Sequence, residues 1–460
     1  MNAVLVSAAL AAAVGLAALG RFLWRQRLRR GLLSLRRELG GRLERRMRKR
    51  EVRQALLADP EIAAAVTTHA RSVGETESAA WQRVHLYVEE IVPDFDLVSY
   101  YRLGYAVARV LVPLFYKVSV GYEAREALDA IPRDSAVLYL MNHRSNADYV
   151  VVAYVLSGRV AVSYAVGEWA RVWPLEAVFK SFGSYFVRRR YREPLYHKVL
   201  ERYVQLVTRQ GVTQGIFLEG GLSRDGRFRE PKLGLLDYLL GTKRDPTFTP
   251  PLHVVPVAIN YDRVLEDRSL LREALPERER LSRREQAMEV ASYVLKVSAR
   301  FLLRRARRYG RACVNFGAPL DVDAWLRARP GVLEKPREER LAALQELAGE
   351  VMARIAAIMP VTAVALACAA LLRHRADAID RPRWEALMDE VRAALRGVRA
   401  PIVGDERTSA EILDRALVML TLRRVVEVEG AVCRIDRRQE PLLRYYANSL
   451  AHFLAPEDRG

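Results

Sequence analysis

The sequence predicts an α/β core framed by helical regions at both ends, and three observations support this. Short β-branched and aromatic runs alternate with helical stretches between about residues 131 and 325, which is typical of an α/β domain. Before and after this part, the apolar residues recur mainly at helical spacing. The 460 residues are 51% hydrophobic, which is enough apolar material for two or three packed units and excludes a disordered chain.

Residues 1–50 are predicted to be a membrane anchor and a basic juxtamembrane helix. Ala3 to Gly20 contain one polar side chain, Ser7, and residues 21–50 then carry thirteen Lys or Arg against two acids, which is +11 of the total charge of +19. The charge follows the apolar run, whereas a cleaved signal peptide carries it before the run, so we expect an uncleaved anchor with the remaining chain in the cytosol. A packed or interfacial alanine-rich helix is the alternative.

The basic block itself has three interpretations. Leucines lie among its arginines, as in a helix resting on anionic lipid. A solvated charged helix and a nucleic-acid-binding arm remain open, although no recognition motif accompanies the block.

The remaining chain divides into three parts. Residues 51–130 are predicted to be a helical lead-in, with a break at Pro113, and residues 131–325 the α/β domain. Residues 326–460 are predicted to be a C-terminal helical region in which residues 374–408 form exposed helix and linker. In the α/β domain the expected strands are 136–140, 160–164, 184–187, 215–218, 254–259 and 312–316. A helix is expected at 281–307, before the last of these strands.

Three well-separated cysteines support neither a disulfide framework nor a thiolate zinc site. Cys313, Cys368 and Cys433 form no C-x-x-C pair, so we expect them to be reduced.

The first candidate for chemistry follows the strand at 136–140. There His143 precedes Asp148 by five residues. A carboxylate that fixes one ring nitrogen leaves the other to accept a substrate proton, and a substrate hydroxyl then serves as nucleophile in acyl transfer to an alcohol. An isolated pair at this spacing is also common in a solvated loop.

Three further clusters lie mostly at the ends of expected strands. They are residues 183–190 with three arginines, residues 217–224 with Glu219 and a Gly pair followed by residues 231–234, and the apolar block 255–257. Each alone could be structural. Together they could converge on one site, because the carboxyl ends of neighbouring parallel strands meet at one edge of a sheet.

With these four blocks in order, the sequence resembles the glycerolipid acyltransferase family across roughly residues 135–265. Within the family the bacterial glycerol-3-phosphate acyltransferases are most similar, and the fold is expected to be their α/β core with flanking helices. The matching residues are His143-Arg144-Ser145 with Asp148, Gly183 with Phe186 and Arg188, Glu219-Gly220-Gly221 with Ser223-Arg224, and Val255-Pro256-Val257 leading to Tyr261. Two positions depart from the pattern: Asn142 is more typical of lysophosphatidic acid acyltransferases, and Leu222 stands where the family usually has an arginine.

The resemblance implies a mechanism and a set of site residues. His143 is expected to act as general base on the sn-1 hydroxyl of glycerol 3-phosphate, oriented by Asp148, while that hydroxyl attacks an acyl thioester. Pro256 is expected to line the acyl side. The residues expected to hold the acceptor are Arg188, Arg189, Glu219, Gly220, Ser223, Arg224 and Lys232.

The resemblance also implies the partners. The expected partners are glycerol 3-phosphate, acyl-CoA or an acyl-carrier protein as donor, and an anionic membrane, with no nucleic acid. No metal or cofactor is expected, because a thioester is already activated and backbone N–H groups can stabilise the oxyanion. The expected location is the bacterial cytoplasmic membrane, with the catalytic domain facing the cytoplasm. Acylation of lysophosphatidic acid or dihydroxyacetone phosphate, or a non-catalytic basic membrane- or nucleic-acid-binding protein, are the alternatives.

Overall fold

The computed structural model describes most of the chain from residue 49 onward. The described residues are 49–92, 105–156, 163–167, 185–188, 191, 193–273 and 309–454. The predicted anchor at residues 3–20, the basic block up to residue 48, the helix at 281–307, Gly183 and Arg189 all lie outside them. Within the described ranges, no helix is long and apolar enough to cross a membrane.

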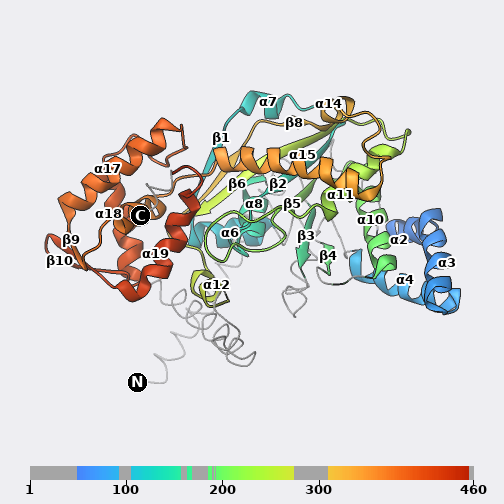
Figure 1. Cartoon of the computed structure of the whole chain (residues 1–460), viewed down its shortest axis with the longest axis horizontal. Coiled ribbons are helices and arrows are strands. Elements are labelled where there is room, and N and C mark those ends of the chain that lie inside the picture. Colours follow the sequence, from blue (N-terminus) through green and yellow to red (C-terminus); the bar gives the residue numbers. More distant parts are fainter. Residues whose placement is uncertain are drawn as a thin grey trace, which may run out of the picture.

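An eight-stranded, mostly parallel sheet forms the centre of the molecule (Figure 1). The strand order is β1-β7-β6-β2-β5-β3-β4, with β8 also paired to β6; β7 and β8 run antiparallel to β6. The strand bounds are β1 Lys117–Tyr122, β2 Ala136–Met141, β3 Ser163–Gly167, β4 Tyr185–Val187, β5 Gln214–Phe217, β6 Leu252–Tyr261, β7 Arg311–Phe316 and β8 Leu320–Asp321. The predicted α/β core is therefore confirmed.

The register of the central strands brings the motifs that follow or lie in β2, β5 and β6 to the same end of the sheet, where these strands have their carboxyl ends. Met141, the last residue of β2, is paired in parallel with Phe217 of β5 and with Val257 of β6. Helices cover both faces, and the central strands are accordingly buried along nearly their whole length. The segments that follow β2 and β5 thus leave the sheet side by side, while β6 continues past them to Tyr261.

The N-terminal helices pack beside the β4 end of the sheet. They are α2 Lys49–Leu57, α3 Pro60–Val73 and α4 Glu77–Ile91, and they contact α10 Pro194–Arg209. The other helices that precede or follow the sheet strands are α6 Tyr105–Phe115, α7 Arg125–Asp129, α8 Asp148–Leu156, α11 Gly234–Leu240, α12 Asp267–Glu273, α14 Val322–Arg327 and α15 Arg337–Ala357. In Figure 1 α15 crosses the sheet, so this helix belongs to the α/β layers even though it lies beyond residue 325.

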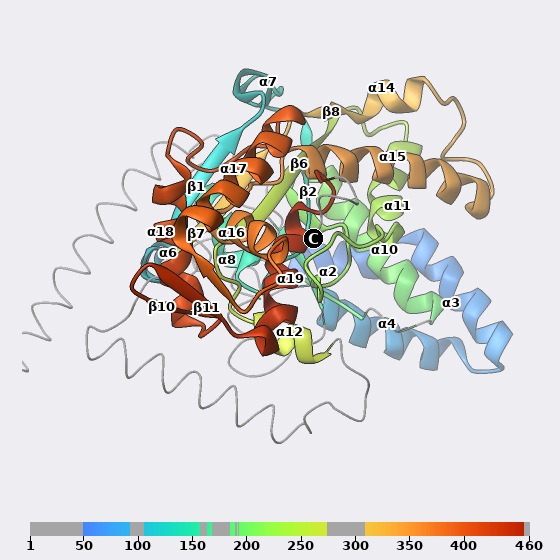
Figure 2. The same cartoon turned by 60° about the vertical axis from the view of Figure 1, so that its left-hand side comes forward.

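A C-terminal unit forms the opposite end of the long axis from the N-terminal helices (Figure 1). Its central helix α16, Ala363–Leu372, is buried at every position from 364 to 372 and is surrounded by α17 Arg381–Gly397, α18 Ser409–Leu422 and α19 Glu440–Ala447. Seen from that end in Figure 2, α19 lies against α12. One hydrophobic core joins this unit to the sheet, because residues of α16 and α17 cluster with those of β6 and β7.

The structure adds to or corrects the sequence predictions in three places. The lead-in 51–130 is mostly helical, as expected, but it also contains β1, which pairs with β7 nearly two hundred residues later, a contact that local spacing does not show. The region 326–460 contains a three-stranded sheet of β10 Val426–Glu429, β11 Val432–Ile435 and β9 Ala378–Asp380. Within residues 374–408 the expected helix is present as α17, but it is not simply exposed: its Trp384 is fully buried and donates a hydrogen bond to the α16 backbone.

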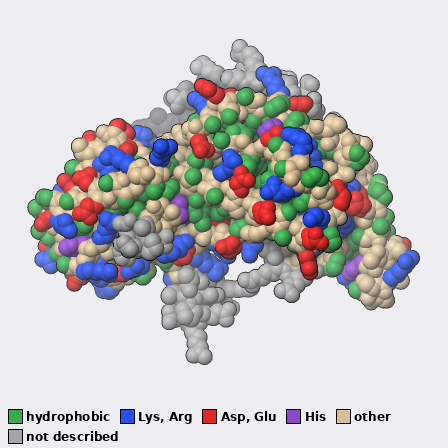
Figure 3. Space-filling view, turned by 45° about the horizontal axis from the view of Figure 1, so that its top comes forward, with side chains coloured by type: hydrophobic (Ala, Val, Ile, Leu, Met, Phe, Trp, Pro, Cys, Tyr) green, Lys and Arg blue, Asp and Glu red, His purple; other side chains and the backbone are tan. Residues whose placement is uncertain are grey.

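Of the strand expected at 160–164, residues 160–162 lie outside the described residues, and residues 163 and 164 belong to β3, which spans 163–167. The three cysteines are free thiols and are all buried. Over the face in Figure 3, acidic and basic side chains are interspersed, so the described residues on this face form no single basic patch.

Candidate active site

The site begins where β2 ends, at Asn142. Its side chain bonds the β6 backbone in both directions: Nδ2 donates to the Ile259 carbonyl (3.0 Å) and Oδ1 accepts from the Ile259 N–H (2.7 Å). The loop that carries His143 therefore leaves the sheet from a fixed point. Asn142, which sequence comparison treated as a departure, thus has a structural role here.

His143 and Asp148 form a buried hydrogen-bonded pair. Nδ1 of His143 lies 2.9 Å from Oδ2 of Asp148, which is the first residue of α8. The same oxygen accepts the main-chain N–H groups of Arg144 (2.8 Å) and Ser145 (3.1 Å). Because the carboxylate only accepts hydrogen bonds, Nδ1 carries the proton and Nε2 is the nitrogen with the basic lone pair.

The other oxygen of Asp148 is held by β6. Tyr261 donates its phenol O–H to Oδ1 at 2.5 Å. Burial, together with the negative charge of Asp148, raises the pKa of Tyr261 well above its ordinary value, so the phenol stays protonated and remains a donor. Four hydrogen bonds thus hold the carboxylate, which keeps the imidazole in one tautomer and one orientation.

Aromatic rings fix the plane of the imidazole. The His143 ring stacks on Phe217 at a centroid distance of 4.0 Å, and Tyr149 approaches it edge-on at 5.5 Å. His143 itself is 1% exposed. The pair predicted from the sequence is therefore a rigid, preorganised unit rather than a solvated loop.

Glu266 supports the same loop, and the sequence analysis did not identify it. Its carboxylate accepts hydrogen bonds from Ser145 Oγ (2.7 Å) and from the Asn146 N–H (3.1 Å). Burial raises its pKa to about 7. No local signal marks Glu266, because it lies 120 residues beyond Asn146 in the chain.

Glu219 follows β5 and lies close to the pair. The residue is 2% exposed, and its Oε2 makes no hydrogen bond with any described residue. Burial raises its pKa to about 8, against the opposing charges of Arg144 and Arg229. A buried carboxyl with unmet hydrogen-bonding capacity at the sheet edge is a candidate ligand for a substrate hydroxyl.

Gly220 shapes the turn after Glu219. Its φ is +63°, and a Cβ built there would lie 2.8 Å from Cγ of Lys232. The Lys232 main chain closes the turn by donating to the Leu218 carbonyl at 2.8 Å. The position therefore requires glycine, and Lys232 is brought beside Glu219 although its side chain is mostly exposed.

Ser223 joins two of the predicted blocks through its backbone. Its N–H donates to the His143 carbonyl at 3.0 Å. Its hydroxyl donates to the Arg227 carbonyl (2.7 Å) and accepts from the Gly226 N–H (3.1 Å), so in this structure it closes a turn. Arg224 next to it is exposed. Acceptor binding by Ser223 and Arg224 stays a prediction.

Arg188, expected to hold phosphate, already has a carboxylate partner. Its Nε donates to Oε1 of Glu90 at 2.7 Å and its Nη2 donates to Oε2, while its guanidinium lies over the ring of Tyr191 at 4.7 Å. Glu90 belongs to α4, so this ion pair ties the N-terminal helices to β4. The sequence analysis missed Glu90 because a charge on an amphipathic helix carries no signal of its distant partner.

Pro256 is buried within β6, opposite Leu140 of β2. Its carbonyl accepts a hydrogen bond from the Gly317 N–H at 2.8 Å. Along β6, Pro256 therefore lies one residue before Val257, the residue that is paired with the end of β2. Its expected role in lining the acyl side stays a prediction.

The C-terminal unit reaches the site through Arg144. This arginine is 2% exposed, donates from Nη1 to the Gly226 carbonyl and lies 5.1 Å from the ring centre of Tyr445 in α19. Its Nε and Nη2 make no hydrogen bond within the described part of the chain. Arg144 stands in the predicted motif beside His143, but nothing in the sequence connects Tyr445 with it.

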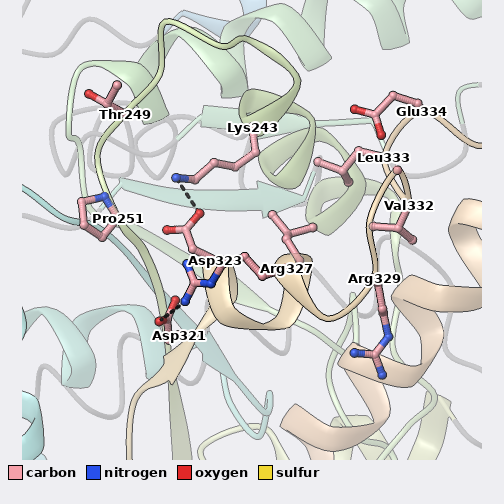
Figure 4. A pocket seen from close by; sticks show the side chains of 12 residues that line it. Lys243, Thr249, Pro251, Asp321, Asp323, Arg327, Arg329, Val332, Leu333 and Glu334 are labelled. Carbon is pink, nitrogen blue, oxygen red and sulfur yellow. Dashed lines mark hydrogen bonds and ion pairs between the residues drawn. The ribbon is translucent and has the colours of Figure 1, made fainter.

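No group of three or more His, Cys, Asp or Glu in the described ranges could hold a metal ion. A cavity of about 600 Å³ lies at the other end of the sheet, before β6 begins (Figure 4). In it Lys243 is paired with Asp323 at 2.7 Å, and none of the predicted site residues lines its wall. The cavity is thus separate from the end of the sheet that carries His143 and Asp148.

Comparison with known proteins gives two matched regions. Residues 125–260 match the acyltransferase family model and residues 291–457 match the glycerol-3-phosphate acyltransferase C-terminal region. The chain is 29% identical over 417 residues to a glycerol-3-phosphate acyltransferase from Aeromonas hydrophila, covering 87% of this chain and 49% of that protein. A second, from Pseudoalteromonas atlantica, is 28% identical over 433 residues, covering 89% and 50%.

The chain therefore spans about half the length of the curated relatives it matches. Among solved structures, the 1-acyl-sn-glycerophosphate acyltransferase PlsC from Thermotoga maritima aligns with 52% of this chain and 74% of that chain, at 19% identity and a TM-score of 0.29.

Proposed function

The two matched regions confirm the resemblance to the glycerolipid acyltransferases, and from that premise we propose that the chain transfers a fatty acyl group from an acyl thioester to the sn-1 hydroxyl of glycerol 3-phosphate. The product is lysophosphatidic acid, an intermediate of phospholipid synthesis. The observation that carries the proposal is the buried His143–Asp148 pair at the carboxyl ends of the parallel strands. The curated relatives of the chain are named glycerol-3-phosphate acyltransferase.

In the proposed reaction the acceptor hydroxyl is the nucleophile. Nε2 of His143 removes its proton while the oxygen attacks the thioester carbonyl. The C–O bond forms, and the tetrahedral intermediate then collapses with cleavage of the C–S bond. The leaving thiolate takes the proton from the imidazolium. Asp148 holds the tautomer and stabilises the transient positive charge on the ring. We propose that no cofactor takes part.

Glu219 is the acceptor-binding residue that the geometry supports best. Burial raises the pKa of its carboxyl to about 8, and its Oε2 makes no hydrogen bond with any described residue, so the group can donate to or accept from a glycerol hydroxyl near neutral pH. Lys232 and Arg224 lie on the same loop and carry the positive charge that a phosphate needs. For Arg188, two of the five guanidinium N–H groups are engaged by Glu90, so phosphate would bind at the remaining ones.

The test is a thioester-release assay with matched acceptors. Purified chain receives one acyl thioester with glycerol 3-phosphate, dihydroxyacetone phosphate or lysophosphatidic acid in parallel. We expect glycerol 3-phosphate to give the highest kcat/KM and His143→Ala to lower turnover by about 10²-fold or more while the fold is kept. Full activity in a folded His143→Ala protein would exclude the residue from the mechanism. Preference for lysophosphatidic acid would instead favour the second candidate, which Asn142 suggests.

We also propose that the enzyme works at the cytoplasmic face of a bacterial membrane. A soluble phosphate enters and a lipid leaves, and residues 3–20 with the basic block behind them combine an apolar insertion with a polybasic patch. Deleting residues 1–20 should make binding to anionic vesicles sensitive to salt, while the full chain stays bound. Recovery of the full chain in the soluble fraction at low salt would contradict the anchor.

Assays with acyl-CoA and with acyl-carrier protein decide which donor is used.

A further inference from the structure

The loop at residues 219–232, which we call the acceptor loop, contains most of the residues proposed to bind the acceptor. It connects β5 with α11 and forms no regular helix or strand. Two main-chain hydrogen bonds hold its ends: Ser223 N–H to the His143 carbonyl, and Lys232 N–H to the Leu218 carbonyl. Neither bond reaches residues 224–231, so the middle of the loop depends on other contacts.

Besides bonds within the loop, contacts come from the end of helix α19 and from the residues that follow it. Nδ2 of Asn448 donates to the Asp225 carbonyl at 2.8 Å. Gly226 packs so tightly against this segment that a Cβ built on it would lie 1.9 Å from the Tyr445 carbonyl oxygen. The ring of Phe228 packs edge-on against His452 at a centroid distance of 5.0 Å. Successive residues of the loop thus contact residues 445–452 of the C-terminal unit.

Arg144 joins the loop, the helix and the catalytic motif. Its guanidinium donates to the Gly226 carbonyl and lies over the ring of Tyr445, while its main-chain N–H donates to Asp148. A cation buried against an aromatic face is held in position more firmly than one in solvent. Through Arg144, the catalytic pair and the acceptor loop therefore both depend on the position of the Tyr445 ring.

Helix α19 is itself anchored to the strand that holds Asp148. The Tyr446 hydroxyl donates to Oδ2 of Asp267 at 2.7 Å and accepts from the Val264 N–H at 3.2 Å, just after β6. Since β6 also supplies Tyr261, α19 and the catalytic pair share one rigid support. A loop bound to α19 is thereby placed relative to His143.

We propose that Tyr445 and Asn448 of the C-terminal unit are positioning residues for acceptor binding, which act by holding the acceptor loop over the catalytic pair. The inference rests on the proposed function, because it assigns the loop to the acceptor. It gives the C-terminal region a defined part in substrate recognition. Loss of the contacts should weaken acceptor binding without altering the chemistry at His143, because the imidazole is held by Asp148, which lies outside the loop.

The principal variant is Asn448→Ala, which removes a half-buried side chain and leaves the core intact. We expect the KM for glycerol 3-phosphate to rise about 5- to 10-fold, with the KM for the thioester and the pH profile of kcat unchanged, an effect of the size of one lost hydrogen bond. Amide hydrogen exchange should accelerate at Gly226 and Arg227, whose N–H groups are bonded within the loop to Ser223 and Asp225.

Tyr445 offers a matched pair of substitutions. Tyr445→Leu removes the ring under Arg144 and should raise the same KM. Tyr445→Phe retains the ring and should leave the KM for glycerol 3-phosphate unchanged, because the Tyr445 hydroxyl makes no hydrogen bond within the described residues. Met388→Ala in α17 is the control: it opens a cavity in the C-terminal unit at a fully buried position outside α19.

The outcomes separate the two hypotheses. Equal KM changes in Met388→Ala and Asn448→Ala would mean that the contacts matter only for stability, and would overturn the inference. Unchanged KM and unchanged exchange in Asn448→Ala would do the same. If the wild-type chain fails to acylate glycerol 3-phosphate, the proposed function fails, while the exchange comparison still tests whether α19 holds the loop.

Discussion

Replacing Asp148 by asparagine isolates the role of its negative charge. Oδ2 accepts three N–H groups, from His143, Arg144 and Ser145, and Oδ1 accepts the Tyr261 hydroxyl. An asparagine whose oxygen takes the Oδ2 position still accepts all three N–H groups. Its amide nitrogen then faces the Tyr261 oxygen, which can reverse its role and accept. Asp148→Asn should therefore keep the fold and the imidazole tautomer.

What Asp148→Asn loses is the attraction between carboxylate and imidazolium. With Nδ1 and Oδ2 2.9 Å apart, the charge centres are about 4 Å apart, which at an effective dielectric of about 20 is worth roughly 4 kcal/mol. Since about 1.4 kcal/mol is tenfold in rate, and the proton is only partly transferred in the transition state, kcat should fall by about 10²- to 10³-fold. The KM for either substrate should change little, because no ground-state contact is lost.

Asp148→Ala provides the contrast. It leaves three N–H groups and one hydroxyl without their acceptor, at about 1–3 kcal/mol for each group that water cannot reach. We expect the free energy of unfolding, measured in urea, to fall by about 4 kcal/mol or more, whereas that of Asp148→Asn stays near wild type. The reasoning is refuted if Asp148→Asn keeps kcat within about 3-fold of wild type, or is as unstable as the alanine variant.

Three further predictions concern the surrounding residues. Because burial raises the pKa of Glu219 to about 8, the folded protein binds the Glu219 proton more tightly than the unfolded chain does. The wild type should therefore lose stability relative to Glu219→Gln as the pH rises from about 5 to 8, with no further change above pH 8. Melting temperatures of the two proteins, measured without substrate across this pH range, test the prediction, and curves that stay parallel would contradict it. Arg188→Ala should cost about 1–3 kcal/mol because Glu90 loses its ion pair with Arg188, and adding Glu90→Gln should recover that stability. A raised KM for glycerol 3-phosphate that persists in the double variant would assign Arg188 to the acceptor, and a restored KM would make its role structural. Gly220→Ala places a methyl against Lys232 at a φ of +63°, so urea unfolding should show a loss of about 1–2 kcal/mol and the KM for glycerol 3-phosphate should rise; an unchanged KM would remove Lys232 from acceptor binding.

Much of the site was predictable because it lies at the ends of strands. Apolar runs marked β2, β5 and β6, and parallel pairing brings their carboxyl ends together whatever the intervening loops contain. His143, Asp148 and Glu219 stood out because their blocks follow expected strands, and the family resemblance then gave them their expected roles. Their convergence follows from the register, which pairs Met141 with Phe217 and Val257.

Elements formed by distant pairing were not predictable in the same way. β1 is half-exposed and short, and its partner β7 lies nearly two hundred residues away, so its local pattern did not distinguish it from the helices around it. The strands β9, β10 and β11 are of three or four residues and are surrounded by helices, which dominated the periodicity of the C-terminal region. Strand pairing is a property of two segments, whereas helical spacing is a property of one.

The sequence by itself determined the class of the core, the order of its motifs and which residue types could perform acyl transfer, because these depend on local periodicity and on the chemistry of single side chains. Only the tertiary structure decided the partner of each charged group: Tyr261 for Asp148, Glu90 for Arg188 and Tyr445 for Arg144. Burial makes each of those pairings necessary, since a charge removed from water must find hydrogen bonds or an opposite charge within the protein. Which side chain meets that need depends on how elements about a hundred residues or more apart are packed.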